Sequence, residues 1–289
     1  MTFREIAASW LSEKEKTVSQ GSYESYKNPL NATIIPVLGE LEEITEEDVR
    51  SFLSTIQENG VKASSFRNYT NIIRNVLRYG SQQGWCKFPS WKVVVNGKDY
   101  KSERQPVLLT PLQERKMVEY LVSTPSPRHL GIFLSLSMGL RLGETCELQW
   151  GSVDLEKGVV NVIEAPGQLR RIPIPSEIMP VLSLCSFGKP FNAYVSTGTT
   201  EPPVSNKSLR DSLKAVSKRL DLPKLIFQDL RHNFVVRCIR SGCGFVPLMK
   251  ILGYTSAQNL YDDYKDYFDG DTAGAMSAQA GVLMDTKRK

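Results

Sequence analysis

The sequence lacks any long apolar run. No window approaches the ~20 consecutive apolar residues that a membrane-spanning helix needs. The first residues also lack the basic-then-apolar pattern of a secretory signal peptide. We therefore expect a cytoplasmic protein with no membrane partner. A hydrophobic content of 41% is still enough for packed cores, and a length of 289 residues favours two domains.

Histidine and paired cysteine are also scarce. His129 and His232 are the only two histidines, so the supply of ligands nearly excludes a histidine-based metal site. The five cysteines include no Cys-x-x-Cys pair, which favours reduced thiols over a metal site or a disulfide framework. The glycine-rich G-x-x-x-x-G-K-S/T loop of nucleotide-binding proteins is absent as well. We therefore expect neither a metal nor an organic cofactor.

The charge balance of the chain is mildly basic. The formal net charge is +5 at pH 7, and the pI is about 8.8. Such a balance permits binding to nucleic acid without requiring it. Charge alone therefore does not assign a partner.

Residues 1–91 have the periodicity of a small helical bundle. Apolar residues recur at helical spacing in four segments joined by short polar connections. Thr45 followed by three acidic residues predicts one helix start, and Gly60 predicts the end of that helix. Ser64 or Ser65 is expected to cap the fourth helix. The basic residues of this segment are Lys62, Arg67, Arg74, Arg78 and Lys87.

Residues 92–106 are basic and weakly apolar, which predicts a linker, and a second domain is expected over residues 107–267. Within the second domain, the alternating pattern from residue 155 to residue 175 predicts two or three short strands. The remaining periodic segments predict helices. The fold class is therefore mainly α with a small antiparallel β-sheet.

Two arginine-containing motifs and a tyrosine cluster carry the chemistry of the second domain. Arg141 lies in the sequence GLRLGE, Arg231 in QDLRH, and Tyr264 in LYDDYKDY. Two guanidinium groups can hold one phosphodiester through bidentate, charge-assisted hydrogen bonds. A phenol nearby can then attack the phosphorus. A lone arginine or tyrosine of this kind would more simply be a surface or packing residue.

These motifs resemble those of the tyrosine recombinases, the phage integrase family, and the resemblance covers nearly the whole chain. The resemblance implies a helical core-binding domain at residues 1–91 and a catalytic domain at residues 107–267. It also implies that the protein cleaves and rejoins double-stranded DNA at specific sites through a 3′-phosphotyrosine. Self-association into a dimer or tetramer on DNA is expected, with residues 268–289 forming a tail that docks on a neighbouring protomer. The alternative is a tail that docks on its own domain or is disordered.

The resemblance also assigns roles to single residues. Arg141 and Arg231 would bind the scissile phosphate, and Tyr264 would be the nucleophile. Tyr264 lies ten positions after Tyr254 in the sequence, which is close to the spacing of the family, and Tyr261 is the second candidate. The alternative is that these tyrosines pack on one face of an amphipathic helix.

The sequence departs from the family pattern at three places. Gln228 stands where the family usually has His or Lys, and Tyr254 where it has His or Trp. The run from residue 166 to residue 170 lacks the usual hairpin lysine, although Arg170 can bring a positive charge there. Gln228 can donate a hydrogen bond to phosphate but cannot transfer a proton, whereas Tyr254 can do either. We assign both residues to the catalytic site.

Two other functions share these motifs. A recombinase-like protein could bind DNA without cutting it, and a covalent protein–DNA adduct would distinguish the two. A type IB topoisomerase-like enzyme would use the same chemistry to relax supercoils without a specific site.

Overall fold

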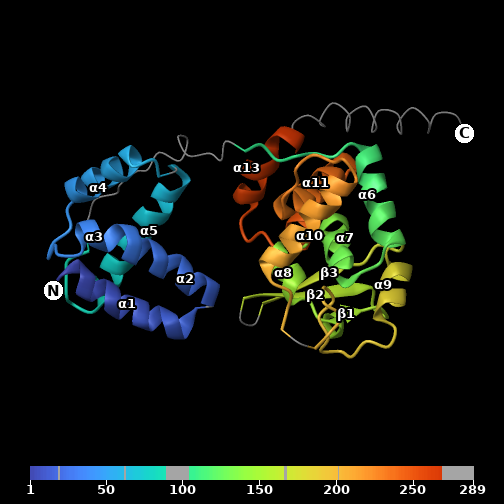
Figure 1. Cartoon of the computed structure of the whole chain (residues 1–289), viewed down its shortest axis with the longest axis horizontal. Coiled ribbons are helices and arrows are strands. Elements are labelled where there is room, and N and C mark those ends of the chain that lie inside the picture. Colours follow the sequence, from blue (N-terminus) through green and yellow to red (C-terminus); the bar gives the residue numbers. More distant parts are fainter. Residues whose placement is uncertain (19, 62, 89–103, 166–167, 201, 269–289) are drawn as a thin grey trace, which may run out of the picture. The chain divides into compact units, whose positions relative to one another are not determined.

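The computed structural model describes residues 1–18, 20–61, 63–88, 104–165, 168–200 and 202–268. The chain divides into two compact units, Met1–Gln105 and Pro106–Lys289 (Figure 1). The predicted linker lies mostly outside the described residues, and so does the predicted tail beyond residue 268. Among the described residues, no helix combines the length and the apolar character needed to cross a bilayer.

The first unit is a bundle of helices around one apolar core. Its helices are α1 (Phe3–Thr17), α2 (Gln20–Pro29), α3 (Ile35–Leu38), α4 (Glu46–Glu58) and α5 (Ala63–Gln82). A π-helical turn, Leu30–Ile34, joins α2 to α3. It follows Pro29, which has no N–H for the regular helical ladder. The core side chains include Phe3, Ile6, Trp10, Leu30, Phe52, Ile73 and Val76.

The predicted boundaries of α4 are confirmed, whereas the predicted start of α5 is wrong. Thr45 caps α4 as expected: its hydroxyl accepts from the backbone of Asp48, whose carboxylate accepts from the backbone of Thr45. Gly60 follows the end of α4 with a φ of +74°. The expected cap of α5 at Ser64 or Ser65 is wrong, because the helix already begins at Ala63. Serine near a helix start does not by itself fix which residue is the cap.

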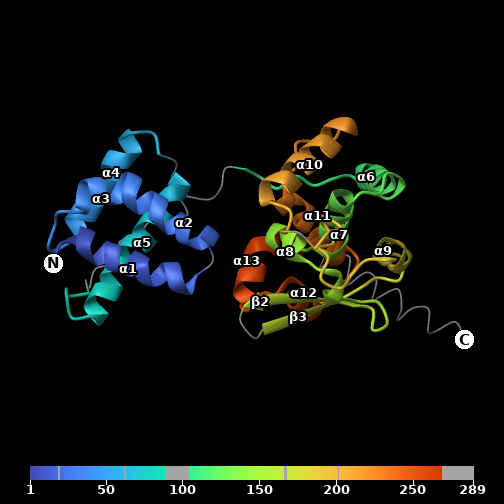
Figure 2. The same ribbon diagram turned by 60° about the horizontal axis from the view of Figure 1, so that its bottom comes forward.

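The second unit is mainly helical with a small sheet at one end (Figure 2). Its helices are α6 (Pro111–Ser123), α7 (Pro127–Met138), α8 (Leu142–Glu147), α9 (Met179–Ser186), α10 (Asn206–Arg219), α11 (Phe227–Arg240), α12 (Phe245–Leu252) and α13 (Ala257–Phe268). The strands β1 (Val153–Asp154), β2 (Val159–Ala165) and β3 (Gln168–Pro173) pair antiparallel in that order. The predicted fold class is confirmed.

Packing in the second unit places the ends of three helices close together. Helix α11 packs against α7, and α12 packs against β3. A separate apolar cluster joins α11, α12 and α13 through Val235, Leu248, Leu252, Leu260 and Tyr264. The end of α7, the start of α11 and the end of α12 thereby surround one small region of the molecule.

Gly139 ends α7 at the centre of this region. Its φ of +70° lies in the left-handed region, which glycine adopts without a steric cost. A Cβ atom on Gly139 would lie 2.5 Å from Cδ1 of Phe234 on α11. Glycine therefore satisfies both the turn and the close approach of α11.

We predict that Gly139→Ala destabilises the protein more than Gly158→Ala. Gly158 has a φ of +64° but no atom within 4 Å of a built Cβ, so alanine there costs only the backbone strain of about 1 kcal/mol. Alanine at 139 adds overpacking, which costs roughly another 1–3 kcal/mol. Denaturant titration of both variants measures the difference, and equal losses would contradict close packing at Gly139.

Candidate active site

Arg231 is a deeply buried charged group of the region. It lies in the second turn of α11 with only 3% of its surface exposed. Its Nη1 donates to the carbonyl oxygen of Gly139 at 2.6 Å, and its Nη2 donates to that of Leu252 at 2.7 Å. Burial, and then the nearby charge of Arg141, lower the pKa of this guanidinium. An arginine nevertheless keeps its charge at neutral pH.

Arg141 stands at the N-cap of α8, two residues after the left-handed turn at Gly139. Its backbone N–H donates to Oε2 of Glu144 at 2.8 Å, and its Nη1 donates to Oε1 of the same carboxylate at 2.8 Å. The side chain of Arg141 remains 42% exposed. The guanidinium is therefore both anchored and accessible from outside.

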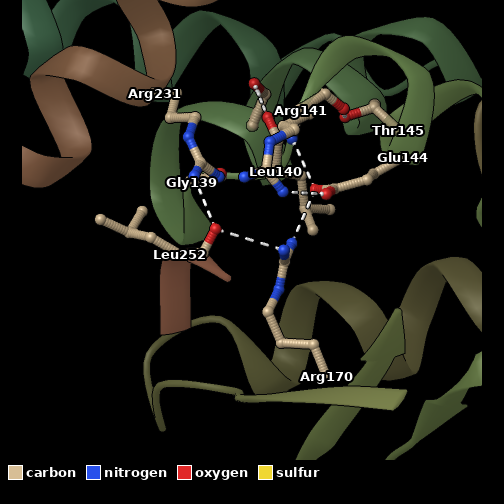
Figure 3. A network of polar contacts seen from close by, with 9 residues as sticks. Gly139, Leu140, Arg141, Glu144, Thr145, Arg170, Arg231 and Leu252 are labelled. Atoms are coloured by element: carbon tan, nitrogen blue, oxygen red, sulfur yellow. Dashed lines mark hydrogen bonds and ion pairs between the residues drawn. The ribbon is translucent and has the colours of Figure 1, made fainter. Parts of the chain in front are cut away.

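Glu144 is shared between two arginines. In addition to its hydrogen bonds with Arg141, Oε2 of Glu144 accepts a hydrogen bond from Nη2 of Arg170 on β3 at 2.8 Å (Figure 3). Burial alone would raise the pKa of Glu144, but the hydrogen bond from the Arg141 backbone and the charge of Arg170 outweigh it. The pKa of this carboxyl consequently lies below its ordinary value, so Glu144 is ionised at neutral pH.

A cavity of about 420 Å³ opens beside the two motif arginines. Arg141, Arg231 and the exposed Gln228 all line it. Three further cations line the same cavity: Arg210, Lys214 and Lys224. Against these five cations the lining has one carboxylate, that of Asp211. The excess of positive charge is what a site for a phosphate backbone requires. The structure brings three of the predicted site residues to one concave surface.

Tyr254 follows Gly253, which ends α12 with a φ of +69°. The Tyr254 ring lies 6.0 Å from the guanidinium carbon of Arg231. Its hydroxyl donates to Oδ2 of Asp263 at 2.8 Å. Burial, followed by this hydrogen bond, raises the pKa of Tyr254 to about 12. Its proton is therefore held toward Asp263.

Tyr264 lies on α13 and is only 3% exposed. Its ring stacks on His232, with centroids 5.0 Å apart and an interplanar angle of 27°. Burial raises the pKa of Tyr264, while the charge of Arg231 partly offsets that rise. Among the described residues, the Tyr264 hydroxyl makes no hydrogen bond. Tyr261, one turn earlier, is 40% exposed, so the two tyrosines do not share one buried face.

Sequence reasoning missed the residues that hold these groups. His232 supports the Tyr264 ring and hydrogen-bonds through Nε2 with the hydroxyl of Tyr267 at 3.2 Å. Asp263 holds Tyr254, and the Leu252 carbonyl holds Arg231. His232 directly follows Arg231 and Asp263 directly precedes Tyr264 in the sequence, and these positions were the available signals. A backbone carbonyl leaves no signal in a sequence.

Two family matches cover most of the chain. Residues 108–269 match the Phage integrase family, and residues 3–91 match the Phage integrase central domain. The tyrosine recombinase XerC of Xylella fastidiosa is 23% identical over 249 residues, which cover 83% of this chain and 84% of that protein. XerC of Roseiflexus castenholzii is 24% identical and covers 74% of this chain and 72% of the relative.

Solved structures share the fold at low sequence identity. The Tn1549 transposon integrase in complex with circular intermediate DNA has a TM-score of 0.73 at 17% identity, covering 98% of this chain and 100% of that one. A lambda integrase dimer bound to a core site has a TM-score of 0.65 at 19% identity. The match covers 89% of this chain and 96% of that one. With both units matched, the chain belongs to the phage integrase family of tyrosine recombinases.

Proposed function

We propose that this protein is a site-specific recombinase that cleaves and rejoins DNA through a phosphotyrosine at Tyr264. The observation that carries the proposal is the convergence of Arg141 and Arg231 on one basic cavity, with the charge of Arg231 acting on Tyr264. The relatives named XerC and the integrases bound to DNA support the same activity.

The proposed reaction exchanges one phosphoester bond for another. The Tyr264 oxygen attacks the scissile phosphorus, the 5′-oxygen leaves, and a 3′-phosphotyrosine forms. A 5′-hydroxyl of the partner strand then attacks that phosphorus and releases the tyrosine. Arg141 and Arg231 stabilise the charge that develops on the phosphorane, and one such donor is worth roughly 3–4 kcal/mol. Because the bonds broken and formed are equivalent, the exchange needs no nucleotide hydrolysis.

Proton transfer in this site differs from the usual family pattern. The Gln228 amide lines the cavity and can donate a hydrogen bond to a phosphate oxygen, but it cannot protonate the leaving 5′-oxygen. Tyr254 can donate a proton only if its hydroxyl leaves Asp263, with which it is hydrogen-bonded. We assign Gln228 to phosphate binding and Tyr254 to positioning and proton transfer, and expect slow chemistry.

We assign the DNA contacts to both domains. Residues 1–91 bind the core of the site, residues 92–106 follow the phosphates as a linker, and residues 107–267 carry the chemistry. The protein acts as a dimer or tetramer on DNA, with residues 268–289 as the docking tail. We also propose that the protein acts in the cytoplasm, because the proposed substrate is DNA. A recombinase-like protein that binds without cutting is the alternative, and the adduct test below separates the two.

We predict that Tyr264→Phe abolishes the covalent protein–DNA adduct on a nicked substrate. The change removes one oxygen and little apolar area, so DNA affinity should stay within about twofold, as expected when ~0.4 kcal/mol or less is lost. The matched control is Tyr261→Phe on the same helix, which should still form the adduct. An adduct lost only in Tyr261→Phe would move the nucleophile to Tyr261, and no adduct in the wild type would favour the non-cutting alternative.

We predict that Gln228→His accelerates cleavage. An imidazole in the cavity can protonate the leaving 5′-oxygen, and such help is worth at most about 10²–10⁴-fold. Because the acid must be protonated, the gain should fade as the pH rises above about 6.5, the ordinary pKa of histidine. Single-turnover cleavage against pH measures this effect. Gln228→Asn, which has no titrating group, is the control. An equal cleavage rate in both variants would contradict protonation of the leaving 5′-oxygen by a group at position 228.

We predict that DNA affinity falls steeply with salt, with a log–log slope of about −0.9 per phosphate contacted. Replacing Arg67 and Arg78 of α5 by glutamine should make that slope shallower. Arg50→Gln is the control, because Arg50 is already paired with Glu46 at 2.5 Å. A salt-independent affinity, or a slope unchanged by the α5 variant, would count against DNA contacts by residues 1–91.

A further inference from the structure

Arg170 is the buried cation of the site that the proposed chemistry does not use. It lies on β3 opposite Val162 of β2, with its side chain only 4% exposed. The next residue, Arg171, points to the other face of the strand and is exposed. The strand therefore directs one arginine into the site and its neighbour into solvent.

The contacts of Arg170 bridge the two halves of the site. Its Nη2 pairs with Glu144 at 2.8 Å, and Glu144 also holds Arg141. Its Nη1 donates to the Leu252 carbonyl at 3.3 Å, and that same oxygen accepts from Nη2 of Arg231 at 2.7 Å. Figure 3 shows Arg170 reaching from the sheet between these two acceptors. One guanidinium thus connects the supports of both phosphate-binding arginines.

Three positive charges lie close together in this network. The guanidinium groups of Arg141 and Arg170 pair with Glu144, and the charges of Arg141 and Glu144 both act on Arg231. Cations this close repel one another, and burial strengthens the repulsion. The acceptors on Glu144 and Leu252 hold the three groups in place against this repulsion. Without them, the two motif arginines would be free to move away from each other.

We propose that Arg170 is a positioning residue that sets the distance between Arg141 and Arg231 before the phosphate arrives. It does not touch the substrate itself, because its own guanidinium is buried on protein acceptors. The inference rests on the proposed function and extends it to a residue outside the two arginine motifs. Lysine cannot replace Arg170, since a compact ammonium lacks the planar fork that reaches both acceptors.

The test compares cleavage of two substrates by the full-length protein. One nicked duplex carries a normal phosphodiester at the scissile position, and the other carries a methylphosphonate, which lacks one charged oxygen. Arg170→Lys and Arg170→Met should slow single-turnover cleavage of the phosphodiester by about 10²-fold, the effect of misplacing a catalytic group by about 1 Å. The deficit should shrink on the methylphosphonate, where arginine charges matter less.

The matched control is Arg171→Met on the same strand, which should cleave both substrates like the wild type. A deficit in the Arg170 variants that is equal on both substrates would mean a merely structural role and overturn the inference. Wild-type rates in both Arg170 variants would overturn it as well. Thermal unfolding of each variant identifies any loss that comes from misfolding, and Arg170→Lys serves if Arg170→Met does not fold.

A second readout does not need cleavage. Inorganic phosphate should shift the side-chain Nε–Hε NMR signals of Arg141 and Arg231 in the wild type, with an affinity several-fold weaker in Arg170→Lys. Equal phosphate affinity would overturn the positioning role. If the wild type forms no adduct but the phosphate result holds, the proposed cleavage fails while the positioning role stands.

Discussion

The arrangement of the site depends on one carboxylate and one carbonyl that hold three guanidinium groups. Glu144 anchors Arg141 and Arg170, and the Leu252 carbonyl joins Arg170 to Arg231. These acceptors come from α8 and from the last residue of α12, while the arginines come from the N-cap of α8, from β3 and from α11. Folding of the second unit is therefore what brings the charges together. On the proposed function, these fixed positive charges are what would bind the scissile phosphate.

The proposed nucleophile, Tyr264, lies in a different environment from the arginines. Tyr264 belongs to an apolar cluster and stacks on His232, and burial raises its pKa. Its phenol is therefore protonated in the free protein, whereas the arginines are charged. The Tyr254–Asp263 hydrogen bond joins the end of α12 to the same helix that carries Tyr264. A phosphate bound at the arginines brings negative charge, which disfavours the phenolate. On the proposed mechanism, Tyr264 therefore loses its proton as it attacks rather than before the DNA binds.

Local patterns predicted the fold well and the site only in part. Capping residues and apolar spacing located the helices, with an error at the start of α5 because several serines there suit a cap. The motifs predicted Arg141, Arg231 and Tyr264 as site residues, and the structure places the two arginines at one cavity. The support from Arg170 could not be predicted, because it depends on strand alternation and on a backbone carbonyl 82 residues further along the chain. Nor does a sequence reveal that Tyr264 is buried and Tyr261 exposed.

The most direct test of this account is to map the attachment site of trapped DNA. The protein would be incubated with a nicked duplex carrying its own site, digested with protease and nuclease, and analysed by tandem mass spectrometry. The account predicts a nucleotide attached to the phenolic oxygen of Tyr264 in the peptide from α13. Attachment at Tyr261 or Tyr267, or no modified peptide from a substrate that is demonstrably bound, would contradict it.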